Sequence, residues 1–219
     1  MHLWDDKKGY LQIPYKKYAY VKHSSGKHIS LYGDRLNRVT TFDKDDPTLH
    51  ESDIPPMTRF LVDQYTDSDE ASTGHRVMFF DIEVEVTDGF PDVQKAYNPI
   101  TSIALYDCMT EKYFTYCFDP HKRIESYEKD NEVVEFYETE YEMLNQFFQK
   151  YLEIRPTIIS GWNSEFFDIP YLYNRAVRIL GPEIANLMSP ISEVIYSEYK
   201  KKHTIAGVSS LDYLQLYRQ

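Results

Sequence analysis

One stretch of the sequence changes from apolar to acidic within the length of a single strand: Val77-Met78-Phe79-Phe80-Asp81-Ile82-Glu83-Val84-Glu85. Its aromatic and branched residues predict a buried central strand, and its acids predict that the strand ends in a functional site. Because side chains alternate between the faces of a strand, Asp81 and Glu83 share one face and Ile82 points to the other. Two adjacent carboxylates resist burial, and a divalent cation would satisfy both. The alternative is an edge strand whose acids face water.

A second stretch, Thr157–Tyr171, combines a short strand, a polar turn and the start of a helix. The β-branched residues that follow Pro156 predict the strand, and Pro170 suits the first turn of a helix that begins near Asp168. Taken by itself, Asp168 is typical of an ordinary helix N-cap. Taken with Asp81 and Glu83, in this order and these contexts, it indicates something other than a cap.

These segments resemble the 3′–5′ exonuclease domain of family B DNA polymerases, and most closely the replicative polymerases of T-even-type tailed phages. Phe80-Asp81-Ile82-Glu83 is similar to the first exonuclease motif of that family. Gly161-Trp162-Asn163 through Phe167-Asp168-Ile169-Pro170-Tyr171 is similar to the second. The segments Asp88–Pro91, Pro99-Ile100 and Ser210–Tyr217 also resemble the phage proteins. The resemblance extends from about Val77 to the end of the sequence and is faint before it.

The order strand, hairpin, helix, strand, helix fits an α/β fold with a mixed central sheet and flanking helices, and the resemblance implies the ribonuclease-H-like exonuclease type. We expect a small β-rich N-terminal domain over residues 1–74 and an exonuclease-like domain over residues 75–219. The boundary is placed in the stretch from Asp63 to Gly74, which is rich in Asp, Ser and Thr.

The resemblance implies proofreading hydrolysis of single-stranded DNA 3′ ends with two Mg²⁺ or Mn²⁺ ions. Asp81 would bind both ions, Glu83 would share one and orient the attacking water, and Asp168 would hold the second, more loosely bound ion. Phe90, Asn163 and Phe167 would hold the frayed 3′ end, although Phe167 could equally belong to the core. Lys202, within the basic cluster 200–203, would touch the DNA backbone or lie in a solvated turn.

The third exonuclease motif of the family lies downstream of the segment that resembles Ser210–Tyr217, and the sequence stops at Gln219. Asp212 precedes that position and is not counted as a substitute for the missing carboxylate. We therefore expect an exonuclease-like domain truncated before its third motif, which alone binds metal weakly and degrades DNA poorly or not at all. The implied partners are the primer-template, the palm, fingers and thumb of the polymerase chain, the sliding clamp and other replisome proteins.

Composition allows such a protein but does not demand it. The chain has 219 residues, of which 42% are hydrophobic and 16% aromatic, as expected of a globular protein. A net charge of −11 argues against a general nucleic-acid coat. The segment from Lys7 to Arg38, however, carries eight basic residues against the single acid Asp34. Its interleaved tyrosines could stack on bases or pack between strands; they are Tyr10, Tyr15, Tyr18, Tyr20 and Tyr32.

The sequence contains no apolar stretch long enough to span a membrane and no signal peptide at its start, so we expect a soluble protein of the cytoplasm, the host cytoplasm if it is phage-encoded. Cys108 and Cys117 are expected to be reduced thiols, without zinc.

The rest of the chain predicts conventional elements. We expect short strands over residues 10–42, a break at Pro55-Pro56, a hairpin of 101–107 with 112–118, and an acidic excursion over 125–138 with one short strand. Thr139–Glu142 is a capping box before an apolar helical stripe. A helix over 169–180, a hairpin over 194–205 and a helix starting within 209–217 complete the prediction.

Two other functions remain open. One is a free-standing exonuclease of the same carboxylate superfamily, which would need a final Asp near a His or Tyr. The other is a non-catalytic module that binds single-stranded DNA or docks a subunit without metal.

Overall fold

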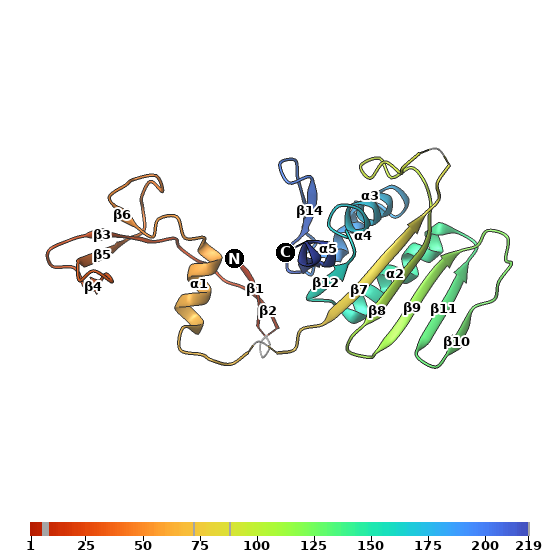
Figure 1. Cartoon of the computed structure of the whole chain (residues 1–219), viewed down its shortest axis with the longest axis horizontal. Helices are drawn as coiled ribbons and strands as arrows, with labels where there is room; N and C mark the ends of the chain where they lie inside the picture. The colour runs from red at the N-terminus through yellow and green to blue at the C-terminus, as the bar shows by residue number, and fades with distance from the viewer. Residues whose placement is uncertain (6–8, 72, 88, 219) are drawn as a thin grey trace. The chain divides into compact units, whose positions relative to one another are not determined.

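A computed structural model describes residues 1–5, 9–71, 73–87 and 89–218 of the chain. The parts of the predictions that fall on Lys7, Lys8, Ser72, Asp88 and Gln219 therefore lie outside the described residues. The chain forms two compact units, Met1–Thr73 and Gly74–Gln219, which are described separately below (Figure 1).

The first unit is built from short antiparallel strands and one longer helix. Its elements are β1 (His2–Asp5), β2 (Gly9–Gln12), β3 (Ala19–Lys22), β4 (His28–Ile29), β5 (Arg35–Val39), β6 (Leu49–His50) and α1 (Pro56–Tyr65). Strand β1 pairs with β2, and a second sheet has the order β4-β5-β3-β6. The expected break at Pro55-Pro56 is confirmed at Pro55, which lies outside any helix or strand, but Pro56 is the first residue of α1. Proline is well tolerated there, since the first helical N–H has no intrahelical partner.

Two tyrosines of the basic segment pack within the unit, as one of the two roles considered for them requires, and a third is exposed. Tyr18 is buried, donates its hydroxyl to Asp63 and lies beneath the guanidinium of Arg59, 4.4 Å from the ring centroid. Tyr20 packs edge-on against Tyr18. Both rings are therefore part of the packing of the unit. Tyr32, in contrast, is 93% exposed.

The second unit is a mixed sheet with helices. Its elements are β7 (Val77–Val84), β8 (Ile100–Asp107), β9 (Lys112–Phe118), β10 (Tyr127–Lys129), β11 (Glu132–Tyr137), α2 (Glu140–Ile154), β12 (Ile158–Gly161), α3 (Asp168–Ile179), α4 (Pro182–Ala185), η1 (Asn186–Met188), β13 (Val194–Ser197), β14 (Lys202–Ile205), β15 (Ser209–Asp212) and α5 (Tyr213–Tyr217). The sheet order is β10-β11-β9-β8-β7-β12-β15, and Figure 1 shows α2 behind these strands. The predicted α/β fold class is thus confirmed.

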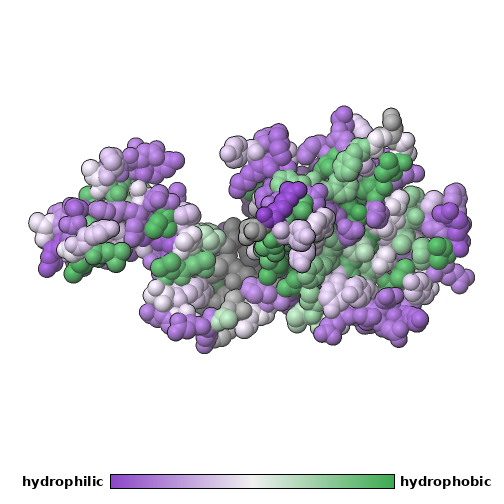
Figure 2. Space-filling view, viewed as in Figure 1, coloured by the Kyte–Doolittle hydropathy of each residue, from purple (hydrophilic) through white to green (hydrophobic). Residues whose placement is uncertain are grey.

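The core lies on one face of this sheet. Met78, Phe80 and Ile82 of β7 are buried there with residues of β8, α2 and α3. On the other face Phe79 of β7 is 43% exposed and stands in register with Tyr106 of β8. Figure 2 shows hydrophobic residues, in green, reaching the surface of this unit between hydrophilic ones. The one-sided core leaves the odd-numbered positions of β7 open to solvent.

Several boundaries differ from the sequence expectation. The acidic excursion forms the hairpin β10–β11, whose second strand joins the sheet parallel to β9. Residues 209–212, expected to start a helix, form β15, which pairs parallel to β12. The hairpin of β8 with β9 and that of β13 with β14 are confirmed. Both cysteines are free thiols and half-buried. Within the described ranges, no helix is long and apolar enough to cross a membrane.

The N-cap half of the capping box before α2 is confirmed. The Thr139 hydroxyl accepts the Glu142 N–H at 3.2 Å and donates to the Glu142 carboxylate at 2.8 Å. Replacing Thr139 by alanine is expected to lower the free energy of unfolding by about 1 kcal/mol, because one helix-terminal N–H loses its acceptor. Thermal unfolding measures the loss. Thr139→Ser, which keeps the hydroxyl, should behave like the wild type, and equal losses in both variants would contradict the capping role.

Candidate functional site

The two acids of β7 occupy the solvent-facing side of a strand inside the sheet. Asp81 and Glu83 are exposed, whereas Ile82 between them is buried. β7 pairs with β8 on one side and with β12 on the other, so it is not an edge strand. The prediction that both acids share one face is confirmed. The edge-strand alternative is wrong about the position of the strand, although the acids do face water.

Asp168 lies at the start of α3 and turns toward β7. It is 3% exposed, and its Oδ1 accepts the backbone N–H of Ile82 at 3.0 Å. The N-cap of α3 is Phe167, so Asp168 is not an ordinary N-cap. Burial raises the pKa of Asp168 to about 7, the negative charges of Asp81 and Asp212 add to the rise, and the Ile82 N–H opposes it. The carboxylates of the two segments therefore interact electrostatically.

A pocket of about 530 Å³ collects the residues that the sequence singled out. It is lined by Asp81, Ile82, Glu83, Phe90, Trp162, Asn163, Phe167, Asp168, Leu214 and Arg218. Lys202 is not among the lining residues; its ammonium group pairs with Glu165 at 2.6 Å. Sequence reasoning missed Arg218, the cation at this pocket, because nothing in its neighbourhood marks it as functional.

Two aromatic rings form one wall of the pocket. Phe90 is 81% exposed, and its ring centroid lies 5.3 Å from that of Phe167. Phe167 is half-buried and packs against the core, while its ring lies 5.7 Å from that of Tyr171. The reading of Phe167 as a core residue is confirmed, and its place in the pocket lining leaves a contact with DNA as a prediction.

The turn that carries Asn163 depends on Asp212. The Asp212 carboxylate accepts the backbone N–H groups of Asn163 at 2.9 Å and Glu165 at 3.2 Å, and it also caps α5 by accepting Leu214 N–H at 2.9 Å. Asp212 is therefore a buried structural acceptor. An Asp directly before a Leu-rich helical segment is an N-cap signal that could have identified this role.

Gly161 allows the strand before this turn to approach β7 closely. A Cβ atom at this position would lie 2.6 Å from the Phe80 carbonyl oxygen and 3.0 Å from the Ser164 Cβ. Any side chain would force the backbone of β12 away from β7, and with it the loop that leads to Asp168.

The donor chemistry of the pocket suits a hard divalent cation, because its acidic groups are carboxylates, and the charge of Asp81 contributes to the raised pKa of Asp168. Among the described residues, no three Asp, Glu, His or Cys side chains lie close enough together to hold a metal ion. The acids thus fit a metal by type, and binding would have to draw them together.

Comparisons with known proteins identify the family of the chain. Residues 63–219 match the family described as DNA polymerase family B, exonuclease domain. A DNA-directed DNA polymerase of Escherichia phage RB69 is 33% identical over 173 residues, covering 66% of this chain and 19% of the phage protein. That of Enterobacteria phage T4 is 32% identical over 167 residues, covering 63% and 18%. DNA polymerase 1 of Saccharolobus solfataricus is 30% identical over 131 residues, covering 60% and 13%.

The chain spans about a fifth of the length of the phage relatives it matches. The family match runs through most of the chain and includes both β7 and α3. The protein therefore belongs to the family B DNA polymerases, whose exonuclease domain it represents.

Proposed function

We propose that the second unit hydrolyses single-stranded DNA from its 3′ end, with Asp81, Glu83 and Asp168 as its catalytic carboxylates. The observation that supports this most directly is the convergence of Asp168 with the two β7 acids on one pocket, across 86 residues of sequence. A pocket of about 530 Å³ falls within the range of small-ligand sites and has room for a terminal nucleotide.

Asp81, Glu83 and Asp168 would hold Mg²⁺ or Mn²⁺, two ions in the complete site. When bound, such ions activate water and stabilise the departing 3′ oxygen. Without a cation, Asp168 retains its proton to about pH 7, so cation binding would release a proton from this residue near neutral pH. Glu83, which is exposed at the pocket, would orient the attacking water.

The remaining lining groups suit a frayed DNA end. The ring of Phe90 is free on its exposed side and would stack on the terminal base. Asn163 would contribute hydrogen bonds, Phe167 would support the stack, and Arg218 would lie near a phosphate. Lys202 would reach the DNA backbone only after its ion pair with Glu165 opens.

Membership of the family B DNA polymerases supports a role for this domain within a larger enzyme. We propose that it serves a phage replicative polymerase that acts in the host cytoplasm, in which palm, fingers and thumb extend a primer-template and a sliding clamp joins the replisome.

A metal titration tests the proposed function. Because the chain alone is expected to bind metal weakly, excess Mn²⁺ should raise its unfolding temperature slightly and support at most slow shortening of a 5′-labelled single strand from its 3′ end. Asp81→Ala should abolish both effects. Glu132→Gln, which neutralises an exposed acid on β11, should change neither. Stabilisation by single-stranded DNA in EDTA that persists in Asp81→Ala would instead favour a metal-free binding module.

A further inference from the structure

The loop between β7 and β8 begins just after Glu83 and carries Phe90 to the pocket. Its base is closed by two bonds: Glu85 N–H donates to Pro99 O at 2.9 Å, and the Asn98 side-chain amide donates to Glu85 O at 2.7 Å. The loop has no strand or helix of its own among its described residues. A turn within the loop is closed by Ala96 N–H, which donates to Asp92 O at 2.8 Å, and by the Asp92 carboxylate, which accepts the Gln94 and Lys95 N–H groups at 3.0 Å. Further bonds reach the loop from α3.

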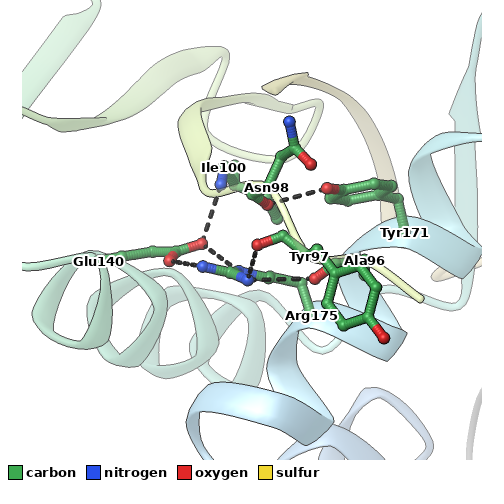
Figure 3. A network of polar contacts seen from close by, with 7 residues as sticks. All are labelled: Ala96, Tyr97, Asn98, Ile100, Glu140, Tyr171 and Arg175. Atoms are coloured by element: carbon green, nitrogen blue, oxygen red, sulfur yellow. Dashed lines mark hydrogen bonds and ion pairs between the residues drawn. The ribbon is translucent and has the colours of Figure 1, made fainter. Parts of the chain in front are cut away.

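One face of α3 holds this loop through its backbone oxygens (Figure 3). Tyr171, Asn174 and Arg175 stand three and four residues apart, which puts them side by side on a helix. Their bonds are Tyr171 Oη to Asn98 O at 2.8 Å, Asn174 Nδ2 to Val93 O at 2.9 Å, and Arg175 Nη1 to Ala96 O at 3.1 Å and to Tyr97 O at 2.6 Å. We call these three side chains the α3 clamp.

The clamp is itself anchored by a buried ion pair. The Arg175 guanidinium meets both carboxylate oxygens of Glu140, the first residue of α2, at 2.8 and 2.5 Å. Glu140 also accepts the Ile100 N–H at 2.8 Å, where β8 begins. Arg175 and Glu140 are 7% and 8% exposed. A two-pronged pair of this kind fixes orientation as well as distance.

The clamp is continuous with the pocket wall. The ring of Tyr171, whose hydroxyl holds Asn98, packs on Phe167, and Phe167 packs on Phe90. The same helix carries Asp168 at its first position. One rigid element thus fixes the loop, the aromatic wall and a carboxylate.

We propose that the α3 clamp is a positioning device that holds the Phe90 loop in place, so that the base at a single-stranded 3′ end finds a preformed stacking site. A loop that had to order on binding would lose conformational entropy at that moment, which weakens affinity. That a DNA base is the ligand rests on the proposed function. That the α3 clamp holds the loop rests only on the hydrogen bonds described above.

Tyr171→Phe tests the clamp, because it removes one hydroxyl and little volume. Tyr173→Phe is its matched control: it lies on the same helix, but its hydroxyl donates to Asn186 at 2.9 Å, away from the loop. Two measurements apply to the full chain. The first is amide hydrogen exchange of Ala96 and Ile100. The second is the affinity, in Ca²⁺, for an oligonucleotide with a 3′-terminal 2-aminopurine relative to one with a 3′-terminal abasic residue.

Tyr171→Phe is expected to speed exchange of the loop amides and to lower the affinity ratio about fivefold, the typical effect of one hydrogen bond. Tyr173→Phe should leave both unchanged. Equal exchange rates in the two variants would overturn the clamp whatever the binding result, as would an equal loss of affinity for both oligonucleotides. A wild-type chain that binds neither oligonucleotide would refute the proposed function and the ligand named for the clamp, while the exchange comparison still decides whether the loop is held.

Discussion

Asp168→Asn is expected to stabilise the metal-free protein, and the gain should grow with pH. The carboxyl of Asp168 ionises in the fold only near pH 7, because burial and the neighbouring acids oppose its charge. In the unfolded chain an Asp ionises near pH 4. Between these values the folded state binds more protons, so the free energy of unfolding falls as pH rises. At pH 8 the ionised side chain carries a penalty on the order of 3 kcal/mol, which the neutral amide avoids.

Thermal unfolding in EDTA measures this effect. Because Asn can still accept the Ile82 N–H, the variant should unfold roughly 10 °C above the wild type at pH 8. The gain at pH 5 should be smaller by roughly 2 kcal/mol. In excess Mn²⁺ the order should reverse, since the amide is a poorer ligand. A gain independent of pH would refute the ionisation argument.

Asp119→Asn is a control that should change the free energy of unfolding in the opposite direction. Burial opposes the charge of Asp119, but the backbone N–H and guanidinium of Arg123 and the N–H of His121 outweigh it, so the pKa of Asp119 is lowered. A lowered pKa stabilises the fold above about pH 4, and that stability is lost as pH falls. Asp119→Asn should therefore destabilise the protein at neutral pH, where Asp168→Asn stabilises it.

The parts of the site that could be predicted from sequence rest on local rules. The shared face of Asp81 and Glu83 follows from strand alternation, and the capping box at Thr139 follows from its residue types. The approach of Asp168 to β7 could be expected from the paired motifs. The sequence places both Phe90 and Phe167 at the expected DNA end, but it does not predict that their rings contact each other.

The parts that could not be predicted depend on partners far away in the chain. The residues of β15 have no strand pattern of their own and form a strand because β12 pairs with them. Toward the opposite edge of the sheet, β11 forms because it pairs with β9. Arg175 and Glu140 stand 35 residues apart, and no spacing rule links them. Pro56 starts a helix, and its neighbours in the sequence do not distinguish such a proline from one that interrupts regular structure.

Arg175→Met is expected to lower the free energy of unfolding of the second unit by about 3–5 kcal/mol, because it leaves the Glu140 carboxylate buried without its cation. The carbonyl oxygens of Ala96 and Tyr97 lose a donor as well. For a unit of this size the unfolding temperature should fall by about 10 °C. Arg178→Met is the matched control, one turn further along α3. Arg178 is exposed and only covers the Tyr97 ring at 4.6 Å, so its loss should be below about 1 kcal/mol.

The double variant Glu140→Leu/Arg175→Met separates a charge effect from a packing effect. If the buried charge causes the loss, removing both partners should be less harmful than the sum of the two single changes, because apolar side chains can replace a buried ion pair at little net cost. The unpaired Ile100 N–H and loop carbonyls should keep the double variant below the wild type. Strict additivity of the two single losses in thermal unfolding would mean that the ion pair does not couple α2 to α3.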